Sequence, residues 1–579
     1  MSTPVRSQCL SASLRPPASL LGPLAIALAA MTVLPLVGPK LVSRFVDGAV
    51  AGRSTATLLA LAGGYLATAV GGQGARLLAS WLASRAVWEG TNRLREAVAD
   101  HTLRLDLDFH ARHTPGEMIE RVDGDVAALG DFLVAFLLEI VASGLLLLGT
   151  LVIVAAEDLR LGAALLVYVA LMAAVVAFSH RRSVPSLVGF REAMARHMGR
   201  IEEQLAAVED LRAAGAGDYS LRRYDASAGD VYTTLRRANG AEALLIAGVS
   251  VTSAFGTAAV LGLAIVLQRH GALSVGATVA LFQYTQLVRQ PLERMTDQLQ
   301  FLQAALAGAG RLRQLLAETP SLTVPVASAS LPAGALALEL DRVDFAYADD
   351  GEEVLAGIDL YLAPGRALGL VGRSGSGKTT IARLLARLYD PTAGAVRLGG
   401  VDLRSVDPGE LRRRVAVVTQ DVVLFDGSLR DNLTLFGTTG ADDTALDGLL
   451  NQLGLGTWLT GLPDGLATRI GPGGAGLSAG EAQLLAFARA FLTEPGLVIL
   501  DEASSRLDPA TEILLEAAVD RLLAGRTAVV IAHRLSSLDR VDDIAVVDGG
   551  RIVETGARVD LLRRPDSRFA TLLARAVAT

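Results

Sequence analysis

Residues 369 to 380 of the chain read GLVGRSGSGKTT. Within them, residues 372 to 379 match the pattern G-x-x-x-x-G-K-[ST] at every position. The apolar run 367–371 predicts a buried strand before the glycines, and 381–388 predicts a helix after them. Backbone N–H groups in such a strand-to-helix turn close around a phosphate, and the helix N-terminus adds partial positive charge. The pattern therefore predicts a phosphate-binding loop, with an unliganded glycine-rich turn as the alternative.

The loop also supplies side chains suited to a nucleotide. Lys378 is expected to bring a compact charge to the β- and γ-phosphates, while the Thr379 hydroxyl is expected to bind Mg²⁺. Lys378 and Lys40 are the only lysines of the chain, so lysine stands where phosphate chemistry calls for it. The phosphate-binding residues expected in the loop are Gly372, Ser374, Gly375, Ser376, Gly377, Lys378, Thr379 and Thr380.

The composition indicates a membrane protein. The chain has 579 residues, of which 51% are apolar, and its mean hydropathy is +0.42. These values favour membrane spans over a series of soluble domains. The net charge of −7 argues against a nucleic-acid partner. The single cysteine, Cys9, excludes an intramolecular disulfide and a cysteine metal cluster.

Six apolar stretches are expected to cross the bilayer as helices. They cover residues 18–37, 57–80, 132–155, 161–178, 243–267 and 273–288. The first is too long for a signal peptide and is followed by further apolar stretches, which favours a membrane helix. The sixth is the shortest, with only about 15 residues between Leu273 and Arg289.

The connections between these stretches set the orientation. Long polar connections at 81–131 and 181–242 alternate with short ones. The second long connection is rich in arginine, so the positive-inside rule places the long connections, residues 1–17 and the C-terminal half in the cytosol. The loop 38–56, expected outside, carries Lys40, Arg44 and Arg53, mildly against that rule. The long connections are expected to continue the membrane helices into the cytosol.

Polar side chains within the spans have two explanations each. Glu139 is costly in hydrocarbon unless it faces water or a partner. It either lines a substrate path or, as we favour, snorkels or faces a neighbouring helix. Gln283, Tyr284 and Gln286 either line a cavity or form hydrogen bonds between helices.

A polar, proline-broken segment divides the chain. The expected domains are a cytosolic segment over 1–17, a transmembrane domain over 18–316, a linker over 317–334 and a nucleotide-binding domain over 335–579. The expected fold is an all-α six-helix transmembrane domain followed by an α/β P-loop ATPase domain.

Three further strands of the C-terminal half end in residues suited to phosphate chemistry. The run 497–500 ends at Asp501, expected to bind the metal, and Glu502, expected to polarise the attacking water. The run 529–532 ends at His533, which could reach a γ-phosphate, and 415–418 precedes Gln420, whose amide could meet Mg²⁺ and water. Without the phosphate-binding loop, solvated carboxylates and a packed histidine would be the better explanations.

Two other features suggest nucleotide contacts. Tyr347 ends a strand-like run about 25 residues before the loop and could stack on adenine, although core packing is the usual role of such a tyrosine. Ser478 and Gly480 open a second predicted helix whose N-terminus could bind phosphate. Since the first loop already holds a phosphate, a head-to-tail dimer is expected, in which each second site closes over the other chain's nucleotide.

These motifs together resemble an ABC transporter of the exporter type, specifically a half-transporter with six membrane helices and one ATP-binding domain. The resemblance covers nearly the whole chain. It implies an adenine contact at Tyr347, Walker A at 372–379, the Q-loop at Gln420, the signature at 477–481, Walker B at 500–502 with catalytic Glu502, the D-loop at 505–508 with nucleotide-contacting Asp508, and the switch histidine at His533. In the membrane half, Phe109, 114–117 and Asp125 are similar to the first intracellular loop, 209–212 to the second, and 290–292 to the pattern of the sixth helix.

The resemblance implies ATP and Mg²⁺ as cofactors and ATP hydrolysis coupled to export of a small molecule, lipid or peptide across the bacterial plasma membrane. An importer on the same scaffold, for instance for a siderophore, or a mainly regulatory subunit are the alternatives; the apolar spans disfavour a soluble DNA-repair-type ATPase. The implied partners are the bilayer, an unidentified substrate and a second half-transporter.

Two departures from the family pattern bear on that second half-transporter. The signature reads LSAGE, with Ala479 and a final Glu where the family has LSGGQ, and Arg506 stands in the D-loop where a small residue is usual. Because Glu502 and His533 are kept, a heterodimer with two unequal ATP sites is expected over a homodimer.

Overall fold

The computed structural model describes residues 13–322, 328–347, 351–419, 422–471, 477–501, 509–532 and 535–577. The chain forms two compact units, one containing Met1–Leu103 and Pro115–Glu318, the other containing Arg104–Thr114 and Thr319–Thr579. Arg104–Thr114 therefore interrupts the transmembrane domain expected over 18–316 and belongs to the second unit.

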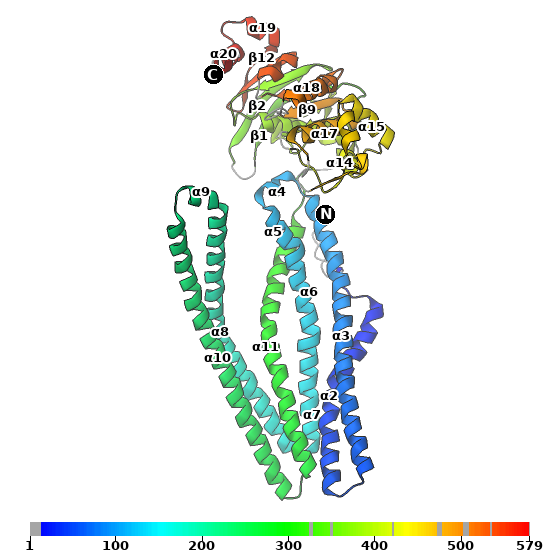
Figure 1. The fold of residues 1–579 in the computed structure, drawn as a ribbon, viewed down its shortest axis with the longest axis vertical. Coiled ribbons are helices and arrows are strands. Elements are labelled where there is room, and N and C mark those ends of the chain that lie inside the picture. The colour runs from blue at the N-terminus through cyan, green and yellow to red at the C-terminus, as the bar shows by residue number, and fades with distance from the viewer. Residues whose placement is uncertain are drawn as a thin grey trace. The chain divides into compact units, whose positions relative to one another are not determined.

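The first unit consists of helices, most of them long (Figure 1). They are α2 (Ala18–Val50), α3 (Thr55–Leu103), α5 (Pro115–Ile119), α6 (Asp125–Ala135), α7 (Ala142–Glu157), α8 (Leu159–Ala206), α9 (Val208–Ala213), α10 (Gly217–Arg269) and α11 (Val275–Ala317). Two π-helical turns, η1 (Glu120–Gly124) and η2 (Phe136–Val141), connect α5, α6 and α7 into one continuous run. The predicted cytosolic extensions are present as continuations of the membrane helices.

Five helical runs in the described part of the chain are long and apolar enough to cross a membrane: α2, α3, Pro115–Glu157, α8 and α10. Between 6% and 33% of the most apolar window of each is buried within the chain, so most of these side chains face lipid or another subunit. The sixth long helix, α11, packs against α2, α6 and α7. It contains the shortest of the six apolar stretches expected from the sequence.

The second unit contains two main sheets. An antiparallel sheet has the order β2-β1-β4-β5, and a six-stranded sheet has the order β12-β11-β3-β10-β9-β6. The strands are β1 (Leu338–Ala346), β2 (Glu353–Leu362), β3 (Ala367–Val371), β4 (Ala393–Leu398), β5 (Val401–Asp402), β6 (Val415–Val418), β9 (Leu497–Asp501), β10 (Thr527–Ile531), β11 (Asp543–Asp548) and β12 (Arg551–Ala557). Two short strands, β7 (Gly427–Ser428) and β8 (Arg469–Ile470), form a separate pair.

The second unit also contains helices. They are α4 (Leu107–Arg112), α12 (Lys378–Leu385), α13 (Pro408–Arg414), α14 (Leu429–Thr434), α15 (Asp443–Gln452), α16 (Gly456–Gly461), α17 (Ala479–Leu492), α18 (Pro509–Leu523), α19 (Arg558–Arg563) and α20 (Arg568–Val577), with 3-10 turns η3 (Leu403–Ser405), η4 (Gly465–Ala467) and η6 (Leu535–Arg540).

The core of this unit explains why its central strands are continuous apolar runs. Along β9, Val498 and Leu500 pack into one hydrophobic cluster, whereas Leu497 and Ile499 pack into the cluster on the other face. Because both faces are covered, the inner positions of such a strand are apolar on both faces. The predicted combination of a helical membrane domain and an α/β domain is confirmed.

Candidate functional site

The site forms where four neighbouring strands end. Strand β10 pairs in parallel with β3 and β9, and β9 pairs in parallel with β6. The carboxyl ends of these strands therefore share one edge, where ligands of open α/β sheets bind. The phosphate-binding loop follows β3, and Asp501 ends β9. Four predicted residues, namely Gln420, Glu502, Asp508 and His533, lie outside the described residues.

Two glycines show why the loop has the composition it has. Gly377 precedes α12 with φ of 107°, a conformation that a residue with Cβ rarely adopts. At Gly372, an added Cβ would lie 2.1 Å from the carbonyl oxygen of Val547. The loop is thus packed against neighbouring backbone and can be closed only by glycines.

Lys378 is held inside this loop. Its side chain is buried, and Nζ donates hydrogen bonds of 2.9 Å to the carbonyl oxygens of Gly372 and Arg373. Burial lowers the pKa of Lys378, and the negative charge of Asp501 raises it. The structure therefore brings together the predicted phosphate-binding lysine and the predicted metal ligand, which are more than a hundred residues apart in the sequence.

The loop fits a nucleotide with its metal. The Ser376 hydroxyl is buried and has no hydrogen-bond partner among the described residues, so a phosphate oxygen would satisfy it. Ser374, Gly375 and Thr379 are exposed at the mouth of the loop. The described residues contain no group of three or more His, Cys, Asp or Glu that could hold a metal. Thr379 and Asp501 are the predicted Mg²⁺ ligands among the described residues, and their binding of the metal stays a prediction.

Tyr347 lies beside the loop with partners that the sequence did not indicate. Its ring packs edge-to-face on Phe345 and Tyr389, with centroid distances of 4.8 and 5.4 Å. Its hydroxyl lies 3.1 Å from the Thr380 hydroxyl and accepts a hydrogen bond from Arg383 at 3.1 Å. The tyrosine is therefore attached to α12, the helix that carries Lys378, and stacking on adenine stays a prediction.

The second predicted phosphate site is also a helix start. Ser478 caps α17, because its hydroxyl accepts the Glu481 N–H at 3.2 Å while the Glu481 carboxylate accepts the Ser478 N–H at 2.7 Å. The last residue of the LSAGE motif thus stabilises the helix start. Gly480 is buried in the first turn.

Arg489 of α17 has a structural role that the sequence motifs did not indicate. Its guanidinium donates to the backbone and side-chain oxygens of Asn432 at 2.8 and 3.1 Å and to the Val423 carbonyl at 2.9 Å. Burial lowers the pKa of Arg489. In the sequence, Arg489 stands out only because it is the one charged residue in the apolar run 482–492. It ties α17 to the segment that follows Gln420.

In the membrane unit, Glu139 faces a neighbouring helix, as favoured from the sequence. Its carboxylate lies 3.4 Å from the Arg76 guanidinium of α3. Gln283 and Gln286 line a cavity, whereas Tyr284 donates a hydrogen bond of 2.9 Å to the Leu36 carbonyl.

A P-loop nucleotide site joined to a bundle of membrane helices defines an ATP-driven membrane protein. A family model described as ABC transporter matches residues 355–505, and one described as ABC transporter transmembrane region matches residues 23–292. The chain is 33% identical over 553 residues to an ATP-dependent lipid A-core flippase of Chromobacterium violaceum, covering 94% of this chain and 92% of the flippase.

A second relative and a solved structure are also similar to the chain. The chain is 34% identical over 472 residues to a multidrug efflux ATP-binding/permease protein of Mycobacterium bovis, covering 81% of this chain but only 39% of that relative. It superposes on the structure of a bacterial Atm1-family ABC exporter with ATP bound, with a TM-score of 0.79 and 25% identity, over 97% of this chain and 100% of the other.

The chain belongs to the ABC transporter family and is a half-transporter of the exporter type. This supports the exporter function over the importer alternative. It is a multi-pass inner-membrane protein with a cytosolic ATPase domain.

Proposed function

We propose that the chain hydrolyses MgATP and uses the energy to move its substrate out of the cell by alternating access, as one half of a dimer. The observation that supports this best is the buried Lys378 beside Asp501 at the sheet edge, in a chain whose other unit is made of membrane helices. The proposed domains are those expected from the sequence, with Arg104–Thr114 as a segment of the membrane half that joins the ATPase unit.

The site residues divide the chemistry among them. Lys378 and the loop N–H groups bind the β- and γ-phosphates and offset their charge, and Thr379, Asp501 and Gln420 hold Mg²⁺. Glu502 orients the attacking water, and His533 contacts the γ-phosphate. Mg²⁺ supplies stabilisation of the charge that develops on the transferred phosphoryl group.

Coupling runs through Arg104–Thr114. This segment belongs to the ATPase unit but is continuous with α3 on one side and α5 on the other. Phe109 is buried, and the carboxylate of Asp106 accepts the backbone N–H groups of Ser321 and Leu322, which follow α11. A displacement of the ATPase unit would therefore act on three membrane helices together.

The partner is proposed to be a second half-transporter whose signature completes the site built on Lys378. Ser478 and Gly480 of this chain would in turn face the partner's nucleotide. Ala479 puts a methyl group where backbone should approach a phosphate, and Arg506 is bulky for a D-loop. These departures favour a heterodimer with unequal ATP sites, and a homodimer is the alternative.

The test uses the full-length chain purified alone and reconstituted in phospholipid vesicles. As one half of a heterodimer, the chain alone should show only low Mg²⁺-dependent ATPase activity, and Glu502→Gln should abolish that turnover while retaining bound nucleotide. Undiminished turnover of that variant would refute the role of Glu502. Full activity of the chain alone, with a dimer mass, would refute the heterodimer and leave the ATPase proposal intact.

A further inference from the structure

A cavity of about 770 Å³ lies inside the membrane unit. It is lined by residues of α2, α3, the run from η2 into α7, and α11. Its volume falls within the range of pockets that bind drug-sized ligands, about 300–1,000 Å³. The cavity is therefore large enough to hold a transported molecule.

The lining combines one charge with neutral surroundings. Among the described residues that line the cavity, Arg76 is the only charged one. Gln73, Gln283 and Gln286 contribute amides, and much of the remaining surface is apolar, with Leu34 and Leu146 as examples. The lining therefore contains one charged side chain, the guanidinium of Arg76, whose ion-pair partner Glu139 does not itself line the cavity.

Glu139 pairs with Arg76 but does not occupy all of its hydrogen-bond donors. It comes from the π-helical turn η2, a feature that is frequent at functional sites. Its Oε1 lies 3.4 Å from Nη2 of Arg76, longer than the roughly 2.7–2.9 Å of a strong charge-assisted hydrogen bond. Among the described residues, Glu139 is the only partner of the Arg76 guanidinium, which has about five N–H donors. Arg76 lines the cavity, with a side chain 43% exposed, and its other donors are available to an anion.

Arg76 lies about one bilayer thickness along α3 from the first residue of that helix. The residue lies about 20 residues after Thr55, where α3 begins on the outer side, or about 30 Å along the helix at 1.5 Å per residue. The hydrocarbon core of a bilayer is also about 30 Å thick. With Thr55 at the outer boundary of the hydrocarbon, Arg76 would lie near the cytosolic headgroups, and Tyr65, Ala69 and Val70, which precede it on α3, would extend the cavity wall toward the outer side.

We propose that this cavity is the substrate site and that it binds a membrane amphiphile with an anionic headgroup, the headgroup on Arg76 and the tail along the apolar wall. This inference rests on the proposed export function and adds its substrate class. A cationic amphiphile would meet the positive charge of Arg76. A small soluble anion would leave the apolar wall unused.

The test measures binding of dansyl-undecanoate, a fluorescent carboxylate amphiphile, to the full-length protein in phosphatidylcholine nanodiscs. Arg76→Gln should weaken binding about tenfold or more, because it removes the charge. Arg76→Lys should retain most of the affinity, and Glu139→Gln should increase it by removing the competing carboxylate. The matched control is Arg85→Gln, because Arg85 is on the same helix in an ion pair with Glu89 but does not line the cavity.

Three outcomes would overturn the inference: equal binding by wild type and Arg76→Gln, tighter binding of a dansyl-undecyl trimethylammonium probe, or displacement of dansyl-undecanoate by acetate at low concentration. ATPase activity of the wild-type protein in the same nanodiscs tests the proposed function separately. If the protein hydrolyses ATP but fails the probe test, only the substrate class is wrong. Binding of a fluorescent ATP analogue to each variant shows that it is folded.

Discussion

The guanidinium of Arg311 in α11 donates two hydrogen bonds to the carboxylate of Asp125 in α6, one from Nε to Oδ2 at 2.9 Å and one from Nη2 to Oδ1. The two ends of this pair differ in exposure, since the Asp125 side chain is 1% exposed and the Arg311 side chain is 47% exposed. The backbone is close as well, because a Cβ on Gly308 would lie 3.2 Å from Asp125 oxygens. This pair links the helix that follows the first intracellular loop to the helix that leads into the ATPase unit.

Because the two side chains differ in exposure, replacing each of them by alanine should lower the stability of the protein by different amounts. Arg311→Ala leaves a buried carboxylate without its partner and should destabilise the protein by about 3–5 kcal/mol. Asp125→Ala leaves a guanidinium that water can reach and should have a smaller effect. The double variant should therefore be more stable than Arg311→Ala alone. Thermal unfolding in detergent checks the order, with Arg313→Ala, an exposed arginine of the same helix, as the control.

The lowered pKa of Lys378 predicts two effects of pH. Between this lowered pKa and the 10.5 of an unburied lysine, the unfolded chain binds more protons than the folded one, so stability should rise with pH across that alkaline window. ATP favours the charged lysine, so nucleotide binding there should take up protons and weaken as pH rises. Calorimetry in buffers of different ionisation enthalpy measures the uptake. Lys378→Met should abolish it and lower turnover about 100-fold or more; uptake that persists in this variant would come from another group.

Two substitutions of Tyr347 can distinguish stacking of its ring on adenine from the hydrogen bonds of its hydroxyl. If its ring stacks on adenine, Tyr347→Ala should weaken ATP binding about tenfold, because base–aromatic stacking contributes about 1–3 kcal/mol. Tyr347→Phe keeps the ring and loses only the contacts with Thr380 and Arg383, so its affinity should stay within about twofold of wild type. Titration with a fluorescent ATP analogue measures both, with the 68% exposed Tyr361 as an alanine control. Equal losses in the two variants would show that the hydroxyl carries the effect.

The central strands and the glycine-rich loop of the ATPase half could be predicted because their signals are local. A strand buried on both faces is apolar along its inner positions, as 497–500 of β9 and 528–531 of β10 are, and the residue types that can bind phosphate or metal stand at or directly after the ends of such strands. Parallel pairing then brings Asp501 to Lys378 without any further information from the sequence.

The membrane half was predictable in its spans but not in its contacts. A helix that is apolar all round carries no signal for its rotation, so the pairing of Arg76 with Glu139, 63 residues later, could not be derived. That Arg104–Thr114 belongs to the second unit could not be predicted from the sequence for a different reason. It depends on contacts with residues far along the chain, such as that of Asp106 with Ser321.

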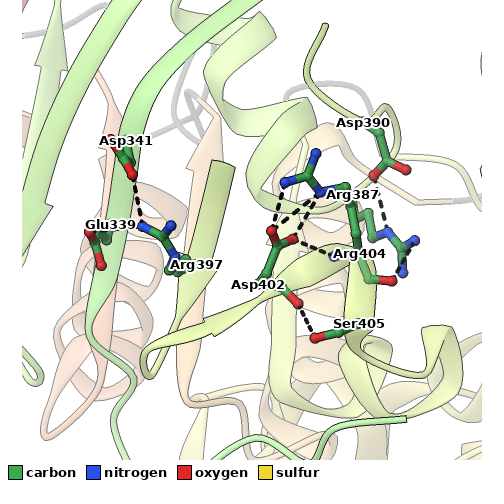
Figure 2. Close-up of polar contacts among 8 residues, drawn as sticks. All are labelled: Glu339, Asp341, Arg387, Asp390, Arg397, Asp402, Arg404 and Ser405. Atoms are coloured by element: carbon green, nitrogen blue, oxygen red, sulfur yellow. Dashed lines mark hydrogen bonds and ion pairs between the residues drawn. The ribbon is translucent and has the colours of Figure 1, made fainter. Parts of the chain in front are cut away.

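Arg387 combines a strained backbone with a buried side chain. It follows α12 with φ of 47°, in the left-handed region that glycine normally occupies at a helix end. Its guanidinium donates to Asp390, the Val406 carbonyl and the Arg404 carbonyl at 3.1, 3.1 and 3.4 Å. Figure 2 shows Arg387 beside Asp390, with Arg404 and its partner Asp402 next to them. The end of the helix that begins with Lys378 is thereby attached to η3.

Substitution of Arg387 can distinguish the backbone strain from the side-chain bonds. Both Arg387→Ala and Arg387→Gly lose the three hydrogen bonds and leave Asp390 without this partner, so both should lower stability, by about 2–4 kcal/mol. Glycine also relieves the left-handed conformation, which costs other residues about 1 kcal/mol. Arg387→Gly should therefore unfold at a higher temperature than Arg387→Ala, although glycine gains more entropy in the unfolded chain. The opposite order would show that the positive φ stores little strain and that the side-chain contacts alone retain Arg387 there.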